Sequence, residues 1–274
     1  MNVSTTSSLV SATDITKYQH DGVVVLRNVL TQNVIAELSD ALAQNMQSPG
    51  PWANEYAANS HQGRFFDDYV NWSRFDAYKT CALSGVLPQI ALALMQKTSG
   101  RFFHEHVLVK EAGNNQVTPW HNDEPYYGID SINNVSLWVP LDPIPEKIAL
   151  RAIAGSHKWG KKFIPRKFVD QSPYVASASE YEPLPDSKQL DVADNIESFA
   201  AMPGDLVAFH FRTLHSAPST TDYPDRRRVI SFRYVDSDAV WSTRPWKTSP
   251  PLEPKELKPG DLLTDERFPL IKTF

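Results

Sequence analysis

The sequence predicts a mainly β fold with flanking α-helices. From Arg101 onwards, short runs rich in β-branched and aromatic residues follow one another and are separated by turn residues. The chain also holds 21 prolines against 11 glycines, which suits ordered loops between strands better than a helical bundle. Several short strands of this kind are typical of a sandwich, a barrel or a jelly roll.

The first elements are expected to be mostly helical. Residues 1–13 are rich in Ser and Thr and have little to bury, so we expect a flexible N-terminal leader. A short helix over residues 14–20 and a β-branched strand over residues 21–29 follow it. Thr31 then caps an amphipathic helix that ends before Ser48.

A second amphipathic helix is predicted over residues 84–97, where apolar side chains recur at helical spacing. The strands come after it, in the runs RFFHEHVLVK, NNVSLWVPL, IALRAIA, DLVAFHF and RRVISFRYV. No repeat or linker divides the chain, so residues 14–274 are expected to form a single domain.

Residues 170–201 differ from this pattern, with seven acidic residues against one lysine. We predict an insert here, which is either an exposed connection or a lid over a site. Long loops in compact domains are often functional, which keeps the lid under consideration.

Composition favours small-molecule chemistry. The formal net charge of −5 provides no overall positive field for nucleic acid. Cys81 is the single cysteine, so neither an intramolecular disulfide nor a cysteine-built zinc site can form. The sequence has no signal-like start and no apolar run long enough to cross a membrane. We therefore expect a cytoplasmic protein with a small-molecule substrate, no nucleic-acid partner and no membrane contact.

His121 and Asp123 are the first candidate metal ligands. Positions i and i+2 of an extended chain point to the same side, so an imidazole and a carboxylate can converge there. His215, at the end of the apolar run DLVAFHFRTLH, is the candidate third ligand, and we expect this run to be one strand. Two histidines and one carboxylate on one face of a metal suit non-haem Fe(II), although zinc accepts the same ligands.

The run Arg226–Arg228 is a candidate anion site. A guanidinium binds a carboxylate through two parallel hydrogen bonds, as a dicarboxylate cosubstrate would require. The alternative is that these arginines are solvated charges of a hairpin. Strand parity groups Arg227 with Val229, Ser231 and Arg233, but both faces of the strand carry apolar residues, so parity alone does not choose between Arg226 and Arg227.

Aromatic residues near these positions are candidates for a substrate pocket. They are Trp120, Tyr126, Tyr127 and Trp241. His104 and His106 form a further pair, which we interpret as strand residues of which one lines the pocket.

The ordered motifs WHNDEPYYG, SLWVPLDP, AGSHKWG, PGDLVAFHFRTLHSAP and RRRVISFRY resemble the phytanoyl-CoA dioxygenase family of Fe(II)/2-oxoglutarate-dependent oxygenases. The resemblance covers about residues 14–234. It implies a cupin-like jelly roll, that is, a double-stranded β-helix, with His121, Asp123 and His215 on Fe(II). In this family an arginine four residues before a serine binds the tail of 2-oxoglutarate, which favours Arg227 and leaves Arg226 as second choice.

The resemblance also suggests Trp138 and His106 as residues of the cosubstrate pocket, with Arg64 and Lys110 as weaker candidates. This chain departs from the family pattern in places. Ala217, for example, stands where a serine is often found two residues after the distal histidine.

The resulting hypothesis is an enzyme that uses Fe(II), 2-oxoglutarate and O2. It would hydroxylate an unactivated C–H bond of a small, partly apolar metabolite and release succinate and CO2. Two alternatives remain: a cupin-like metal-dependent hydrolase or isomerase that uses no 2-oxoglutarate, and a noncatalytic jelly-roll binding module.

Overall fold

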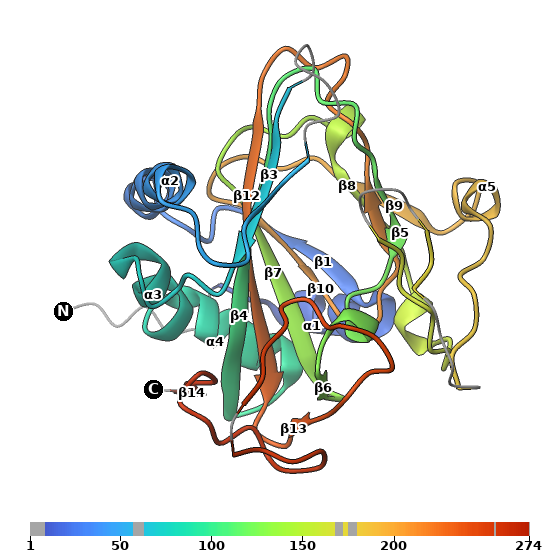
Figure 1. The fold of residues 1–274 in the computed structure, drawn as a ribbon. Helices are drawn as coiled ribbons and strands as arrows, with labels where there is room; N and C mark the ends of the chain where they lie inside the picture. Colours follow the sequence, from blue (N-terminus) through green and yellow to red (C-terminus); the bar gives the residue numbers. More distant parts are fainter. Residues whose placement is uncertain (1–8, 57–62, 168–171, 175–179, 255, 274) are drawn as a thin grey trace.

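The structure, a computed structural model, describes residues 9–56, 63–167, 172–174, 180–254 and 256–273. Within them two antiparallel sheets face each other, and helices cover the outer face of the larger sheet (Figure 1). A mainly β fold with flanking helices is therefore confirmed. Because no pairing between described strands joins the two sheets, the double-stranded β-helix remains an interpretation.

The larger sheet contains eight of the described strands. Its order is β1 (Val23–Leu26), β10 (Leu206–Phe209), β7 (Asn134–Pro140), β12 (Arg227–Asp236), β4 (Ser99–Lys110), β3 (Phe65–Tyr69) and β2 (Asn54–Glu55), and β14 (Leu270–Lys272) also pairs with β4. The long strand β12 lies in the middle, between β7 and β4. Its inner face points toward the smaller sheet and carries much of the site described below.

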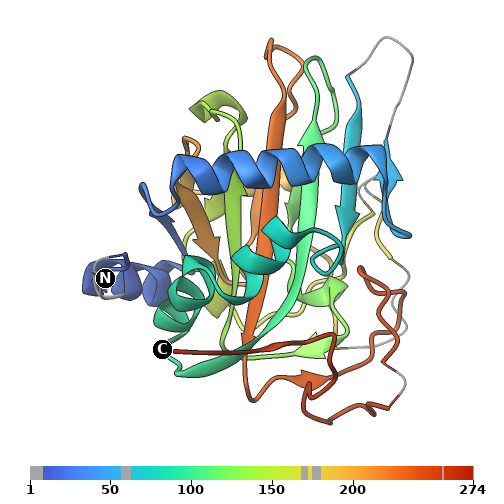
Figure 2. The same ribbon diagram turned by 90° about the vertical axis from the view of Figure 1, so that its left-hand side faces the viewer.

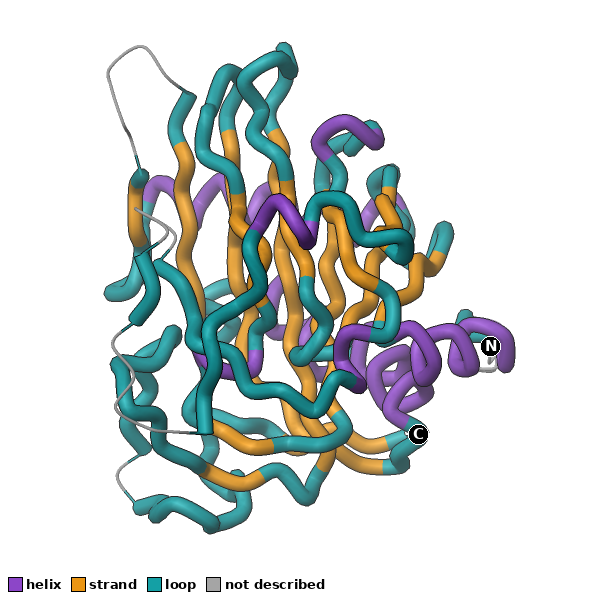
Figure 3. Tube along the Cα trace, turned by 90° about the vertical axis from the view of Figure 1, so that its right-hand side faces the viewer, coloured by secondary structure: helices purple, strands orange, loops and turns teal. Residues whose placement is uncertain are grey.

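The smaller sheet consists of β5 (Thr118–His121), β11 (His215–Ala217), β8 (Leu150–Ile153) and β9 (Ile196–Phe199), in that order, and Figure 3 views the molecule from its side. A separate pair, β6 (Ile129–Asp130) and β13 (Val240–Trp241), lies near the C-terminal segment. Short 3-10 turns occupy Glu124–Tyr126, Glu146–Ile148 and Ser156–Lys158.

The run from Leu206 to His215 is not one strand, which corrects the prediction from sequence. β10 ends at Phe209, the chain turns so that the Thr213 N–H donates to the His210 carbonyl at 2.8 Å, and His215 begins β11 in the other sheet. The chain crosses between the sheets at this turn, and the crossing delivers His215 to the space between them.

Three helices lie on the side of the larger sheet away from the smaller one: α2 (Gln32–Gln47), α3 (Asp76–Leu83) and α4 (Val86–Met95). The helix α1 (Ala12–Asp21) lies beside β1, and its Lys17 pairs with Glu197 of β9 at 2.8 Å (Figure 1). The long helix α2 crosses the strands of the sheet (Figure 2). α1 begins with a capping box formed by Ser11 and Asp14, and Thr31 caps α2 as predicted.

Two details of the predicted helices differ from the structure. α4 is shorter than the predicted helix over residues 84–97, because Gln96 adopts a left-handed conformation with φ of 54° and ends it. α3 was not predicted, since it is short and its first residues have no side-chain cap. The main core fills the space between the helices and the outer face of the sheet.

Three predictions concern the chain's organisation. Of the predicted leader, residues 1–8 lie outside the described residues, whereas Val10 is already buried. Within residues 170–201, β9 is a strand of the smaller sheet, and α5 (Ser187–Leu190) packs beside that sheet (Figure 1). Residues 168–171 and 175–179 lie outside the described residues, so the lid remains a prediction, as does the single domain.

Among the described helices, none has the length and apolar character needed to span a membrane.

Candidate metal centre and adjoining pocket

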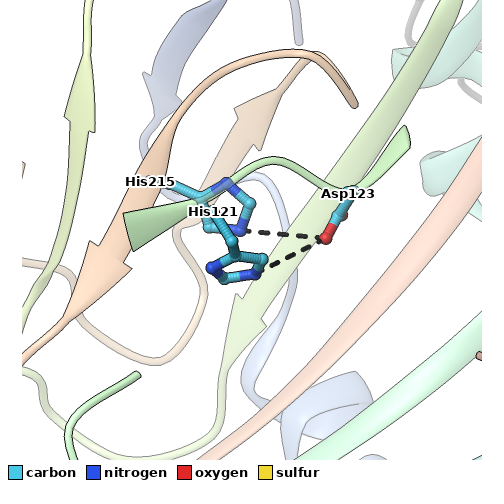
Figure 4. A group of neighbouring side chains, drawn as sticks. All are labelled: His121, Asp123 and His215. Carbon is cyan, nitrogen blue, oxygen red and sulfur yellow. Dashed lines mark ion pairs between the residues drawn. The ribbon is translucent and has the colours of Figure 1, made fainter. Parts of the chain in front are cut away.

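Two histidines and one aspartate meet between the sheets. His121 ends β5, His215 begins β11, and the two are cross-strand partners. Asp123 follows β5 by two residues, where its backbone N–H donates to the Phe211 carbonyl at 2.7 Å. One ligand atom from each of the three side chains lies within 4.8 Å of the others (Figure 4). The three predicted ligands therefore form one cluster.

Both imidazoles present Nε2 to Asp123. Nε2 of His121 and Nε2 of His215 lie 3.8 and 3.9 Å from Oδ1 of Asp123. On the opposite side of each ring, Nδ1–H donates to a backbone carbonyl, that of Pro119 at 2.8 Å and that of Thr213 at 2.9 Å. These bonds favour the tautomer in which Nε2 carries the lone pair, so the donor set fits a divalent transition metal.

The protonation states of the three side chains also suit metal binding. Burial, together with the neighbouring His215, lowers the pKa of His121 to about 3, and burial also lowers the pKa of His215. Both rings are therefore neutral at pH 7, and neutral imidazole is the form that binds a metal. Burial alone would raise the pKa of Asp123, but Arg233 and the two histidines outweigh it and hold that pKa well below its ordinary value.

Asp123 is also held from the larger sheet. Its Oδ2 accepts a hydrogen bond from Ser136 Oγ at 3.0 Å and one from Arg233 Nε at 3.4 Å. Ser136 on β7 and Arg233 on β12 are cross-strand partners and are both buried. The two oxygens of this carboxylate thus have different surroundings: Oδ1 faces the histidines and Oδ2 faces the larger sheet.

Two buried cations lie in the same pocket. Arg227 on β12 and Lys110 on β4 are cross-strand partners and are 6% and 2% exposed. Arg227 donates to the Ile148 carbonyl at 2.6 Å, and Lys110 donates to the Gln116 carbonyl at 2.6 Å and to Thr118 Oγ1 at 3.1 Å. Among the described residues, no carboxylate lies within ion-pair distance of either cation.

The absence of a described acidic partner has a cost. Burial lowers the pKa of Arg227 to about 10, and burial with the charge of Arg227 lowers the pKa of Lys110 well below its ordinary value. Like charges directly opposite each other on neighbouring strands destabilise a sheet. An anion bound between Arg227 and Lys110 would remove this cost, so this part of the pocket can bind a carboxylate.

Most of the predicted pocket residues line the pocket between the triad and the two cations. They are Trp138, His106, Tyr126, Tyr127, Arg227 and Lys110. His104 lines it as well as His106, which corrects the expectation that only one of the two does. Both side chains point inward because they are two residues apart on β4.

Two predicted aromatic residues do not line this pocket. Trp120 precedes His121 on β5, so its side chain points to the other face of the smaller sheet, where it packs in an apolar cluster and donates to Asp191 Oδ1 at 2.9 Å. Trp241 lies on β13 beside Gly128, where it packs against the apolar cluster behind the pocket.

Two weaker candidates for the cosubstrate site lie elsewhere. Arg64 forms an ion pair with Glu55 near the edge of the larger sheet. Arg226 precedes β12 and is exposed, whereas Arg227 is the first residue of the strand and points inward. The structure therefore favours Arg227 over Arg226.

Sequence reasoning missed Arg233 and Ser136 as neighbours of the metal site. The signal for Arg233 was present, because strand parity places it on the same face as Arg227, and that face is the inner one. Ser136 lies in a strand whose other residues are mostly apolar, and its sequence context gives no sign of its hydrogen bond to Asp123.

Solved structures support the same fold. The alpha ketoglutarate dependent carbocyclase SnoK from nogalamycin biosynthesis is 21% identical, with a TM-score of 0.76 over 98% of this chain and 99% of that chain. The epimerase SnoN with Fe3+, alpha ketoglutarate and nogalamycin RO is 20% identical, with a TM-score of 0.71 over 97% and 98%. EctD from S. alaskensis with 2-oxoglutarate and 5-hydroxyectoine is 15% identical, with a TM-score of 0.63 over 94% and 84%.

A search of curated protein sequences finds no match. The sequence profile of the phytanoyl-CoA dioxygenase family, in contrast, matches residues 18–229, which is well over half of the chain and includes the triad and Arg227. The chain therefore belongs to the phytanoyl-CoA dioxygenase family of Fe(II)/2-oxoglutarate-dependent enzymes.

Proposed function

We propose that this protein binds Fe(II) through His121, Asp123 and His215 and oxidises a C–H bond of a small, partly apolar metabolite. One observation carries the proposal: the triad shares a pocket with a pair of buried cations that have no carboxylate partner among the described residues. Three ligands on one face leave three positions for the cosubstrate and O2. We interpret the facing sheets around this pocket as the two halves of a double-stranded β-helix.

Arg227 binds the distal carboxylate of 2-oxoglutarate in this proposal, and Lys110 assists it. The buried guanidinium can donate two parallel hydrogen bonds to that carboxylate, and Lys110 adds a second charge from the neighbouring strand. Trp138 and His106 line the same pocket, where they would contact the sides of the cosubstrate.

The substrate binds in an outer cavity that adjoins the inner pocket. The two share Tyr69, His106, Tyr126 and Ser249. The outer cavity measures about 420 Å³ against about 80 Å³ for the inner one, so it is the larger of the two. Five aromatic side chains line it: Trp52, Tyr56, Tyr69, Tyr126 and Tyr174. Such a lining suits a partly apolar substrate with a ring.

The chain's own residues position the reactants and exclude water. The triad residues are 6% exposed or less, so bulk water has little access to the place where the substrate C–H bond would lie. Bound iron, with 2-oxoglutarate and O2, supplies the oxidising power, and the cosubstrate leaves as succinate and CO2.

Hydroxylation is the outcome that we propose, and product analysis distinguishes it from others. The similar structures include a carbocyclase and an epimerase. Mass spectrometry of the product separates the three outcomes, because hydroxylation adds one oxygen atom, ring closure removes two hydrogen atoms and epimerisation leaves the mass unchanged.

An anaerobic titration tests the cofactor chemistry without a known substrate. Metal-free protein receives Fe(II) and then 2-oxoglutarate, and the visible charge-transfer band of their complex is recorded. We expect the band in the wild type, no band in His215→Ala, and a need for much more 2-oxoglutarate in Arg227→Ala. Iron binding without a band at saturating 2-oxoglutarate would favour the hydrolase or isomerase that uses no cosubstrate.

A further inference from the structure

We propose that Arg233, together with Ser136, is a positioning residue that makes Asp123 bind the metal through Oδ1 alone. This inference rests on the proposed function, since it assumes that the triad binds a metal. It assigns a role to a buried arginine that neither the ligand set nor the cosubstrate site requires.

The geometry around Arg233 is specific. Arg233 is 4% exposed, and its Nε donates to Asp123 Oδ2 at 3.4 Å. Its Nη1 donates to the Ser231 carbonyl at 3.4 Å, and its Cζ lies 5.6 Å from the centre of the Tyr127 ring. Bonds at both ends of the guanidinium restrict its orientation, so Nε keeps facing Asp123.

Asp123 Oδ2 therefore has two donors on the larger sheet, Ser136 Oγ and Arg233 Nε. The other oxygen, Oδ1, is the one that lies 3.8 and 3.9 Å from the two imidazole Nε2 atoms. A metal between the imidazoles and Oδ1 meets a carboxylate whose second oxygen is already hydrogen-bonded. Bidentate binding would require Oδ2 to give up the Ser136 bond and the charged bond from Arg233.

The number of ligands decides what the site can do. A six-coordinate metal with two histidines and a monodentate carboxylate keeps three positions open, which is the number that a chelating cosubstrate and O2 need. A bidentate carboxylate would occupy one of these positions. The hydrogen bonds to Oδ2 thus preserve the third open position.

The test counts water molecules on a bound metal, using Mn(II) as the probe and water-proton relaxation as the readout. We expect about three coordinated waters in the wild-type Mn(II) protein and about two in Arg233→Met/Ser136→Ala, because Oδ2 without these two donors is freer to turn to the metal. In the Fe(II) enzyme, the double variant should lose at least about tenfold in kcat for 2-oxoglutarate consumption while KM for 2-oxoglutarate changes less than about threefold.

Arg228→Met is the matched control. Arg228 is on the same strand but points to the other face, where it pairs with Asp142 at 2.7 Å, so the water count should stay at about three. Ser136→Ala alone carries the test if the double variant does not fold, and its mean count should lie between two and three. Arg233→Lys restores a charge and should recover part of kcat.

Two results would overturn the proposal. One is an unchanged water count and kcat in the variants of Arg233 and Ser136, and the other is an equal loss of water in Arg228→Met. If the wild type itself binds neither Mn(II) nor Fe(II), the proposed function fails as well, whereas normal binding with an unchanged count removes only the role of Arg233.

Discussion

The two faces of β12 have opposite characters although they belong to one strand. The outer face presents Ile230, Phe232 and Tyr234, which are fully buried against the helices. The inner face presents Arg227, Val229, Ser231 and Arg233, which line the pocket. Both faces are excluded from water, so burial alone does not distinguish the core from the site. The chemistry of the side chains does, because the outer ones are apolar or aromatic and pack on apolar neighbours, whereas the inner ones include two arginines that face the pocket.

This contrast shows where the fold gives up stability for binding. Arg227 faces Lys110 across the sheet, and the Ser231 hydroxyl has no hydrogen-bond partner among the described residues. Both the facing charges and the unpartnered hydroxyl lower the stability of the protein without ligand. Substitutions on the inner face should therefore weaken ligand binding and change the stability of the fold little. Substitutions on the outer face should lower stability and change ligand binding little.

The largest expected effect on activity comes from removing a metal ligand. In His215→Ala, Fe(II) binding and 2-oxoglutarate consumption should fall by about 10³-fold or more, because only two ligands remain. Circular dichroism and thermal unfolding should still report a folded protein. His20→Ala is the control, since His20 is an exposed histidine far from the triad in sequence. Normal turnover in His215→Ala would contradict the proposed metal site.

The largest expected effect on stability comes from the outer face. Phe232→Ala should reduce the free energy of unfolding by about 3–5 kcal/mol, because a fully buried ring leaves a cavity. Its neighbour Ser231 is equally buried but points inward, and Ser231→Ala should cost less than about 1 kcal/mol because the hydroxyl makes no described hydrogen bond. Urea denaturation measures the free energy of unfolding of both variants. Equal losses of that free energy would show that the two faces contribute equally to stability.

A smaller effect, confined to the cosubstrate, is expected at Arg227. Arg227→Met should weaken 2-oxoglutarate binding by about 10- to 100-fold, since a hydrogen-bonded charge pair is lost. The stability of the protein without ligand should change by less than about 1 kcal/mol, because the repulsion with Lys110 is relieved. Thermal shifts with added 2-oxoglutarate measure the affinity, and Arg228→Met on the other face should retain the wild-type shift.

Several of these features could be predicted from the sequence, and the failures have a common cause. The spacing of His121 and Asp123 and the strand parity that groups Arg227 with Val229, Ser231 and Arg233 are local patterns, and the structure places each group together, although parity alone does not choose between Arg226 and Arg227. Which face of a strand points inward depends on the neighbouring sheet, so Trp120 was assigned to the wrong side.

Contacts between segments far apart in the chain were likewise beyond local patterns. His215 reaches the triad through a turn between two sheets, where an unbroken apolar run suggested one strand. Arg233 meets Asp123 only because β12 and the segment after β5 lie opposite each other, 110 residues apart in sequence. Helix positions, in contrast, were predicted where caps such as Thr31 mark them, and α3 without a side-chain cap was missed.

The smallest effects are expected from pH, and here His121 on β5, at the site, and Glu105 on β4, on the side toward the helices, oppose each other. At the site, burial lowers the pKa of His121 to about 3 in the metal-free protein, so the unfolded chain binds more protons between pH 6.5 and 3. Stability should therefore fall as the pH falls through that range. On the outer side, burial raises the pKa of Glu105 to about 8, so the folded protein binds more protons between pH 4.5 and 8.

The contribution of Glu105 to stability is present at low pH and is lost as the pH rises to 8. Relative to the wild type, Glu105→Gln should gain stability as the pH rises from 5 to 8, because the neutral amide cannot ionise. His121→Gln should gain relative stability in the other direction, as the pH falls from 7 to 5. Urea denaturation of metal-free protein at several pH values measures both trends. If the stability of a variant changes with pH as that of the wild type does, the substituted group does not contribute to the pH dependence. Opposite trends would mean that acid weakens the site between the two sheets while alkali weakens the helix-covered face of the larger sheet.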